Sequence, residues 1–410
     1  MTSHDRAPDR TVQAGHLVEF LLDAGHAWQA TLAALDGARR VIDGQLYCLH
    51  ADAVGDAFVA ALVRARGRGV VVRLVLDGLG SATTAERQLA DLVGAGVLLR
   101  VFGPLRIGVP WRYWMRRNHR KVFCMDDEVA LVGGRNVGDA YFAPDGVLTG
   151  RWLDAGLLVR GPLVHDVAAL LRADWQGRMR AGHRRDWLWD LTPAKDRPGR
   201  RLAAAARTAH RPHAAAPPPA IPCAPCGPTR AALAVNHGAL RTGLANSAYA
   251  AAVRAAQRDI CLANAYFLPG RRLRLALLAA SRRAVRVRIL LPAFRVNDVR
   301  VAGLAMEHGL SRFLRHGAEV RLVTHTMLHA KFGVVDGDAW WTVGSANMDR
   351  LSLHRNLEAN VVGQGDCAPL RAAFEQWWAQ AEPWTLAKAR SRPWWRKLLG
   401  WLAWQARYVL

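Results

Sequence analysis

The chain has 410 residues, of which 51% are hydrophobic and 22% charged, and its mean hydropathy is −0.01. This length predicts two to three domains with buried cores, and the composition excludes a wholly disordered chain and a small disulfide-stapled scaffold. The 56 Lys and Arg residues outnumber the 33 Asp and Glu residues, which gives a formal net charge of +23. Such an excess predicts a polyanionic partner, either an anionic lipid surface or nucleic acid.

The predicted elements repeat in chain order. The first half reads as a strand over 38–49, a helix over 55–66, a strand over 70–76, a helix over 85–94 and a strand over 97–102. The second half reads in the same order as 258–268, 271–281, 285–291, 301–316 and 319–323. This repeat predicts an α/β fold of two pseudo-symmetric halves, each a mixed, largely parallel sheet flanked by helices. We place the halves at residues 14–180 and 231–383.

The segment between the halves, residues 181–230, is rich in Arg, Ala and Pro and follows neither the helix nor the strand period. It is interpreted as a surface linker. Cys223 and Cys226 within it have the spacing of a redox or zinc motif, but no second pair of ligands follows, so we expect no metal there. Cys48, Cys124 and Cys261 lie in apolar runs and are predicted to be buried free thiols, as in a reducing compartment.

No window of the sequence is long and apolar enough for a membrane-spanning helix, and the N-terminus has no signal-like run, so we expect a chain that does not cross a bilayer. Trp alternates with Arg in residues 103–118 and again in the final segment, 384–410. This composition is typical of a segment that lies at a membrane interface. The predicted membrane contacts are Trp394, Trp395, Trp401 and Trp404. The alternative is a terminal helix whose tryptophans belong to the core of its own domain.

Only five of the 56 cations are lysines, and two of these stand in a duplicated motif. The first copy has His119, Lys121 and Asp126 followed by Asn136, and the second has His329, Lys331 and Asp336 followed by Asn347. The His-to-Asn separation is 17 residues in the first copy and 18 in the second. On a strand, His-x-Lys presents an imidazole and a compact ammonium on one face, which suits a phosphate group. Each Asn follows a glycine turn that allows close approach to an anion.

This duplicated His-x-Lys-x4-Asp pattern with a downstream Gly-x-Asn resembles the phospholipase D superfamily. The run from Gly344 to Asn360 and the stretch from Asn264 to Pro269 resemble the bacterial cardiolipin synthases within it. Since no N-terminal spanning helix is found, the chain is most similar to the soluble, peripherally bound branch. The resemblance implies an active site at the interface between the halves.

The resemblance also implies metal-free phosphodiester transfer through a phosphohistidine, with no cofactor. Lys121, Lys331, Asn136 and Asn347 would then surround the phosphate with fixed positive charge and hydrogen-bond donors. We predict His119 as the nucleophile because a longer insertion separates it from the preceding strand, 17 residues against 6 for His329, and because the family places the nucleophile in the first copy. His329 would act as the acid and then the base.

Two further pairs of acidic residues accompany the motif copies. Asp154 and Glu358 lie one strand beyond the first and second copy and are predicted to orient the histidines by binding the second ring nitrogen. Asp126 and Asp336 are expected to be structural, in salt bridges near the interface of the halves.

The leading hypothesis is a cardiolipin synthase-like phosphatidyltransferase that passes a phosphatidyl group to phosphatidylglycerol and releases glycerol, peripherally bound at the cytoplasmic face of the cell membrane. One alternative is a phospholipase D-type phosphodiesterase that hydrolyses phospholipid or nucleic acid. Another is an inactive basic membrane-binding adaptor, which two intact motif copies argue against. The Trp/Arg segments favour lipid over nucleic acid as the partner, and the sequence makes no prediction of oligomeric state.

Overall fold

The computed structural model describes residues 12–104, 116–147, 151–177, 188–191, 227–237 and 244–407. In the first half, the elements are β1 (Gln13–Leu21), α1 (Ala24–Gly37), β2 (Val41–Leu46), α2 (Ala53–Gly67), β3 (Val71–Asp77), α3 (Glu86–Gly94), β4 (Leu98–Phe102), β5 (Val122–Met125), β6 (Val129–Gly133), β7 (Gly156–Arg160), α5 (Leu163–Trp175) and β8 (Leu188–Leu191).

The second half begins with β9 (Thr229–His237), α7 (Leu244–Ala255), β10 (Asp259–Asn264), α8 (Arg271–Arg282), β11 (Arg286–Pro292), α9 (Arg300–Leu314), β12 (Glu319–Val323), β13 (Lys331–Val335), β14 (Trp340–Gly344), α10 (Arg350–His354) and β15 (Leu357–Gln364). The chain then continues through α11 (Ala368–Gln380), β16 (Glu382–Pro383), α12 (Leu386–Ser391) and α13 (Trp394–Gln405).

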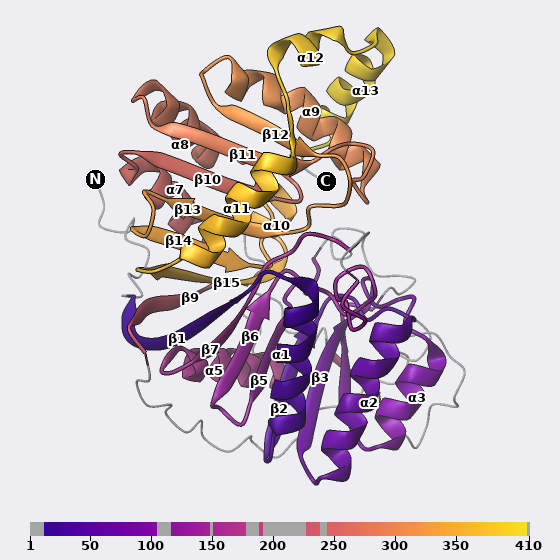
Figure 1. Ribbon diagram of the computed structural model, residues 1–410. Coiled ribbons are helices and arrows are strands. Elements are labelled where there is room, and N and C mark those ends of the chain that lie inside the picture. The colour runs from indigo at the N-terminus through magenta and orange to yellow at the C-terminus, as the bar shows by residue number, and fades with distance from the viewer. Residues whose placement is uncertain are drawn as a thin grey trace.

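One continuous sheet of 16 strands runs through both halves, which lie one above the other in Figure 1. The halves join where β1 pairs with β9 in antiparallel orientation. Outward from this seam the first half runs β7, β6, β5, β2, β3, β4 and the second runs β15, β14, β13, β10, β11, β12. The β2-β3-β4 and β10-β11-β12 pairs are parallel and the other pairs antiparallel. The predicted mixed sheet in two pseudo-symmetric halves is therefore confirmed.

Helices cover both faces of each half. In β5, Phe123 and Met125 pack into the core under α1, α2 and α3, whereas Val122 and Cys124 face α5. The second half uses α7, α8 and α9 on one face and α11 on the other. The central strands are apolar on both sides because both faces are covered, as is usual for parallel sheets. The two halves thus place their motif strands, β5 and β13, in equivalent and rigid positions.

The motif aspartates differ from the prediction. Asp126 accepts hydrogen bonds from the backbone N–H groups of 39, 40 and 41 at 2.7 to 2.8 Å, at the far end of β5 from Lys121. Asp336 accepts from 257, 258 and 259 at 2.7 to 3.0 Å in the same way. They are structural, but the prediction of salt bridges at the interface is wrong. Both aspartates have a positive φ, 55° for Asp126 and 52° for Asp336. Each carboxylate accepts hydrogen bonds from backbone N–H groups at the start of β2 or β10 that would otherwise be unpaired.

Several predicted segments lie wholly or partly outside the described residues. They are the pair Cys223 and Cys226, most of the Trp/Arg insertion at 103–118, and most of the linker at 181–230. Within that linker range, β8 is described and pairs antiparallel with β4, so it extends the first-half sheet. Cys48, Cys124, Cys261 and Cys367 are buried free thiols.

The C-terminal helix α13 packs on α9, at the outer edge of the second half (Figure 1). Arg392 and Arg396 bind the buried carboxylate of Glu307 at 3.2 and 2.9 Å. The Trp404 ring fills the space above Gly309, where a Cβ would lie 2.4 Å from it. The prediction of Trp404 as a membrane contact is therefore wrong, because its ring belongs to the packing between the two helices.

Candidate active site

The two motif copies meet at the seam through exchanged backbone hydrogen bonds. The His119 N–H donates to the carbonyl of Leu357 at 3.0 Å, and the N–H of Leu357 donates back to Arg117 at 2.9 Å. The His329 N–H donates to the carbonyl of Leu153 at 2.7 Å in the matching position. Each histidine is thus fixed by a segment of the opposite half.

The carboxylates are exchanged in the same sense. The Nδ1 atom of His119 lies 3.0 and 3.1 Å from the carboxylate oxygens of Glu358, which begins the last long strand of the second half. The Nδ1 atom of His329 lies 2.6 Å from the carboxylate of Asp154 in the first half. Each acid therefore serves the histidine of the other copy, rather than the one it follows in sequence. Since both Nδ1 atoms are engaged, the Nε2 atoms are the ones available for chemistry.

Both lysines are buried beside their histidines, with 4% and 0% of their surface exposed. Lys121 Nζ donates to the carbonyl of His119 at 2.9 Å. Lys331 Nζ lies 2.7 and 2.9 Å from the two ring nitrogens of His329 and also contacts its carbonyl oxygen. The arrangement concentrates cationic charge where each imidazole faces the seam.

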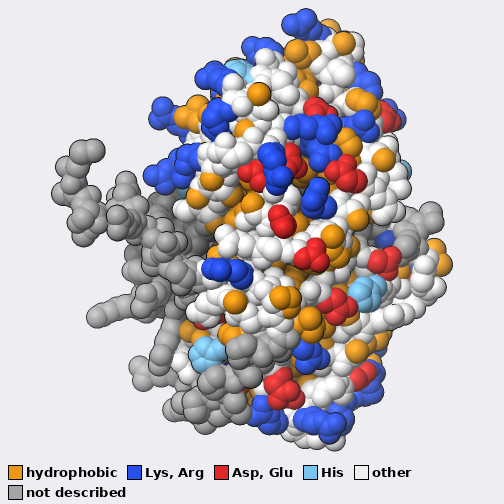
Figure 2. All heavy atoms as spheres, turned by 60° about the vertical axis from the view of Figure 1, so that its left-hand side comes forward, with side chains coloured by type: hydrophobic (Ala, Val, Ile, Leu, Met, Phe, Trp, Pro, Cys, Tyr) orange, Lys and Arg blue, Asp and Glu red, His pale blue; other side chains and the backbone are white. Residues whose placement is uncertain are grey.

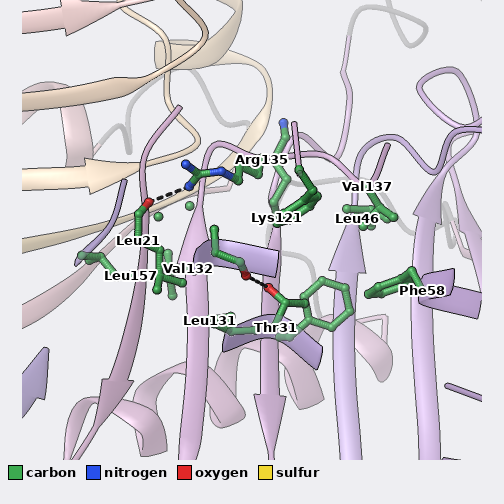
Figure 3. A pocket seen from close by; sticks show the side chains of 15 residues that line it. Leu21, Thr31, Leu46, Phe58, Lys121, Leu131, Val132, Arg135, Val137 and Leu157 are labelled. Atoms are coloured by element: carbon green, nitrogen blue, oxygen red, sulfur yellow. Dashed lines mark hydrogen bonds between the residues drawn. The ribbon is translucent and has the colours of Figure 1, made fainter. Parts of the chain in front are cut away.

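The pKa values of both lysines are lowered, chiefly by burial. Beneath Lys121 an apolar cavity between α1 and the sheet is lined by side chains such as Leu46, Phe58 and Val132. Figure 3 shows Lys121 Nζ turned away from this lining, so its stem contributes to the wall. Burial, together with the charge of Lys331, holds the pKa of Lys121 well below its usual range. Burial lowers the pKa of Lys331 to about 8, although Asp154 opposes the shift.

The two histidines are held neutral. Burial lowers the pKa of His329 to about 4, with further repulsion from Lys331. Burial and then the charges of Lys121 and Lys331 hold the pKa of His119 well below its usual value. A neutral imidazole has a free lone pair on one nitrogen, which is the form required of a nucleophile or a base.

The two carboxylates have unequal environments. Burial raises the pKa of Glu358 to about 8, although Ser345 donates its hydroxyl to Oε2 at 2.6 Å. Burial alone would raise the pKa of Asp154, but Lys331 and His329 hold it below its ordinary value. Gly134 stands where the second copy has Ser345, because a Cβ there would lie 2.3 Å from Asp154 Oδ1. The first copy therefore has Gly-Gly beside the shorter Asp154, and the second copy has Gly-Ser beside the longer Glu358.

Asn136 and Asn347 are both buried at the ends of the turns that follow β6 and β14. Asn136 Nδ2 donates to the Tyr141 hydroxyl at 2.9 Å. Within the described ranges, the Oδ1 atoms of Asn136 and Asn347 have no hydrogen-bond partner. Buried polar atoms are nearly always satisfied, so an unpartnered amide oxygen in each copy is typical of a ligand-binding site.

Three aromatic residues that the sequence analysis missed surround the histidines. Tyr47 meets the His119 ring edge-on at 4.8 Å between centroids, and Tyr141 meets the His329 ring at 5.2 Å. Trp152 lies 5.5 Å from His329. Two of them could have been found from position, since Tyr141 follows Asn136 by five residues and Trp152 precedes Asp154 by two. They exclude water around the imidazoles, which strengthens the electrostatic interactions there.

The described residues contain neither a cluster of metal-ligand side chains nor a membrane-spanning helix. Across those ranges, no three His, Cys, Asp or Glu side chains are grouped as a metal site requires. No helix in the same ranges is long and apolar enough to cross a bilayer.

A sheet of two pseudo-symmetric halves, with the His-x-Lys segment of each half held by a segment of the other, defines the phospholipase D fold class. The family model described as "Cardiolipin synthase, PLD-like domain" matches residues 31–149 and 249–378. The chain belongs to this family. The predicted resemblance is therefore confirmed, as is the prediction that the chain is an enzyme of the phosphatidyltransferase class.

Curated relatives agree with the family match. The chain is 28% identical over 355 residues to "Cardiolipin synthase B" of Salmonella typhi, covering 85% of this chain and 76% of the relative. It is 28% identical over 353 residues to the protein of the same name from Escherichia coli K12, with the same coverage. Among solved structures, the phosphatidylserine synthase of Haemophilus influenzae Rd KW20 superposes with a TM-score of 0.71 at 15% identity, covering 96% of this chain and 95% of that one. This last likeness concerns the fold.

Proposed function

We propose that the protein is a cardiolipin synthase-like phosphatidyltransferase that moves a phosphatidyl group to phosphatidylglycerol through a phosphohistidine intermediate and releases glycerol. The observation that carries the proposal is the exchanged pairing of His119 with Glu358 and of His329 with Asp154. It turns both Nε2 atoms away from the orienting acids, beside two buried lysines, with Lys331 Nζ 2.9 Å from His329 Nε2. The names of the curated relatives support the substrate class.

In the first step, His119 acts as the nucleophile. Its depressed pKa keeps it neutral, and Glu358 accepts the Nδ1 proton, which leaves the Nε2 lone pair to attack phosphorus. The Nε2–P bond forms while the bond from phosphorus to the glycerol oxygen breaks. His329, protonated, donates its Nε2 proton to the departing alkoxide.

For this step His329 must carry a proton, although burial lowers its pKa to about 4. A bound phosphodiester places a negative charge beside it, and a nearby anion favours the charged imidazolium. In the second step the neutral His329 removes the proton of the acceptor hydroxyl, whose oxygen attacks phosphorus and releases His119. The product is the new phosphodiester, and both histidines return to their starting protonation states.

The lysines and asparagines bind the transferring phosphoryl group. Lys121 and Lys331 each supply a compact ammonium charge, in contrast to the planar guanidinium of arginine. Asn136 and Asn347 supply side-chain amides at the turns. Fixed charge in a site that excludes water stabilises the charge that develops on the equatorial oxygens. This assignment makes the transfer independent of a metal ion.

Binding to an anionic membrane surface, at the cytoplasmic leaflet, belongs to the same proposal. Helix α13 exposes Trp394 and Trp395, at 75% and 51%, together with Leu398, Leu399, Trp401 and Leu402. Residues 384–410 contain six Lys and Arg and no acidic residue. Figure 2 shows further Lys and Arg side chains on the upper part of the molecule, which is the second half, with fewer acidic ones between them. Exposed Trp and Leu flanked by cations are typical of interfacial helices.

The test is to incubate the full chain with phosphatidylglycerol vesicles and to follow lipid products and free glycerol. Cardiolipin and glycerol formed in equal amounts support transfer. Phosphatidic acid as the main product would instead support a phosphodiesterase, and no product at all would support an inactive adaptor.

The nucleophile is tested with His119→Asn and His329→Asn, using a donor whose leaving group needs no proton. Label retained on the protein without His329 but lost without His119 supports the assignment. The reverse pattern would exchange the two roles, and labelling of neither variant would argue against a covalent intermediate.

A further inference from the structure

The loop between β11 and α9 brings one acidic residue, Asp298, to the edge of the sheet where the second motif copy begins. At this edge Asn264, the last residue of β10, pairs with Lys331, the first residue of β13. Tyr266 follows two residues after Asn264 and donates its hydroxyl to Asp298 Oδ1 at 2.6 Å. The Tyr266 and Asp298 pair therefore lies at the edge of the sheet where Lys331 begins β13, close enough for the charge of Asp298 to act on Lys331.

Asp298 has capacity for a further partner. Its Oδ1 atom also accepts the N–H of Val299 at 3.1 Å, while no described residue bonds its Oδ2 atom. The side chain is exposed, and the adjacent Asn297 already accepts the same N–H at 2.9 Å. Asp298 is not the residue that begins α9 either, since that helix starts at Arg300. The local structure thus gives little reason for a carboxylate here.

The charge of Asp298 reaches the site. The pKa of Lys331 is lowered by burial, and Asp154 and then Asp298 are the charges that oppose this. Burial and the charge of Asp298 also raise the pKa of Tyr266, which keeps its hydroxyl protonated as the donor. A carboxylate so close to a phosphate site repels a phosphodiester, so its presence is unfavourable unless substrate hydroxyls bind it.

The first half has no counterpart. Its equivalent loop, residues 78–85, contains no acidic residue. Asp77, which ends β3, is buried and bound by the N–H groups of Leu79, Gly80 and Asn118. The free carboxylate oxygen is thus found only on the His329 side of the described seam, the side on which the acceptor alcohol is activated in the proposed mechanism.

We propose that Asp298 and Tyr266 form the acceptor subsite and select a polyol, such as the glycerol headgroup, over a simple alcohol. This inference rests on the proposed transferase function. Asp298 Oδ2 accepts a hydrogen bond from one hydroxyl of the acceptor, and the Tyr266 oxygen, which donates its own hydrogen to Asp298 Oδ1, accepts from a neighbouring hydroxyl. The remaining hydroxyl is then directed to His329. A monohydric alcohol leaves both acceptors unpaired.

The experiment uses the full chain, phosphatidylglycerol as donor, and deuterated glycerol and 1-propanol as competing acceptors at equal concentration. Mass spectrometry gives the ratio of deuterated phosphatidylglycerol to phosphatidylpropanol, which does not depend on the amount of active enzyme. Asp298→Asn keeps an oxygen for Tyr266 but loses the charge, so the ratio should fall about tenfold. Tyr266→Phe should lower the same ratio by a smaller factor.

The matched control is Asp338→Asn, an exposed aspartate in the turn between β13 and β14, at the end of β13 away from Lys331. Its ratio should equal that of the wild type. If Asp298→Asn leaves the ratio of the two products unchanged, the subsite proposal is overturned, even if both products are reduced together. Asp298 would then only hold Tyr266 in position. If the wild type forms neither alcohol product and no cardiolipin, the proposed transferase function fails first. If it forms cardiolipin but neither alcohol product, the transferase function stands and the polyol subsite is overturned, so the two failures are distinguishable.

Discussion

His119 of the first half lies 3.0 Å from Glu358 of the second, and this contact, with its reciprocal between His329 and Asp154, makes each imidazole dependent on both halves. A paired carboxylate fixes the ring tautomer with the proton on Nδ1 and the lone pair on Nε2. Each motif histidine therefore takes its hydrogen-bonding acid from the opposite half.

Replacing an orienting acid by its amide tests this dependence. In Glu358→Gln and Asp154→Asn the amide nitrogen can donate to Nδ1, which favours the wrong tautomer, so transfer should fall by about 10² to 10⁴. Lipid transfer rates measure the effect, and Asp338→Asn serves as the control for a lost surface carboxylate. Activity within a few-fold of wild type in either variant would contradict the assigned role.

The lysines should not tolerate arginine. Lys121→Arg and Lys331→Arg keep the charge but introduce a planar fork into sites with 4% and 0% exposure, so we expect losses of about 10² or more in transfer rate. The opposite exchange at exposed Arg87, Arg87→Lys, should leave the rate unchanged. Near-normal turnover in Lys331→Arg would argue against direct phosphate contact.

The pH dependence of kcat, which reports the substrate complex in which the bound phosphodiester keeps His329 protonated, should be a bell with one limb from Glu358 and one from Lys331. Glu358, with a pKa of about 8, must lose its proton to accept from His119, so activity rises as the pH rises through that value. Lys331, also with a pKa of about 8, must keep its proton to bind phosphate, so activity falls above it. Because Glu358 and Lys331 are coupled, the apparent pKa values of the two limbs describe the pair and not either residue alone.

Ser345→Ala provides a check on the acidic limb. Its hydroxyl lowers the pKa of Glu358, so its removal should move that limb to higher pH and leave the alkaline limb in place. A profile that is flat between pH 6 and 9 would contradict both assignments.

The exposed face of α13 should govern binding to anionic vesicles. Trp394→Ser with Trp395→Ser removes two exposed rings, so sedimentation with phosphatidylglycerol vesicles should weaken while Tm stays within a few degrees. Trp404→Ala, on the packed face, should lower Tm instead. Truncation after Pro383 would be a poorer test, since it would also leave the buried Glu307 without Arg392 and Arg396. Undiminished sedimentation of the double variant would remove α13 from the membrane proposal.

Transfer should persist in a chelator. The two buried lysines supply the charge that a metal ion would otherwise provide, and the motif has no metal-ligand spacing. Product formation in excess EDTA measures this, and a loss that added divalent cation restores would contradict it.

The sequence by itself determined the repeat of strands and helices, because their apolar periods are local. It also predicted that each histidine lies next to the lysine two residues later, because side chains at i and i+2 of an extended segment point the same way, although both histidines precede the first residues of β5 and β13. The unusual lysines in an arginine-rich chain marked the same positions.

Only the tertiary structure decided which acid serves which histidine. Glu358 and Asp154 follow the copies they do not serve, and the exchange comes from backbone pairing between segments 239 and 175 residues apart. The roles of Asp126, Trp404 and Asp298 depended on it too, since each is set by a loop or helix that packs from elsewhere in the chain. Local periodicity gives the direction of a side chain within its element, but its partner is fixed by how elements distant in sequence pack together.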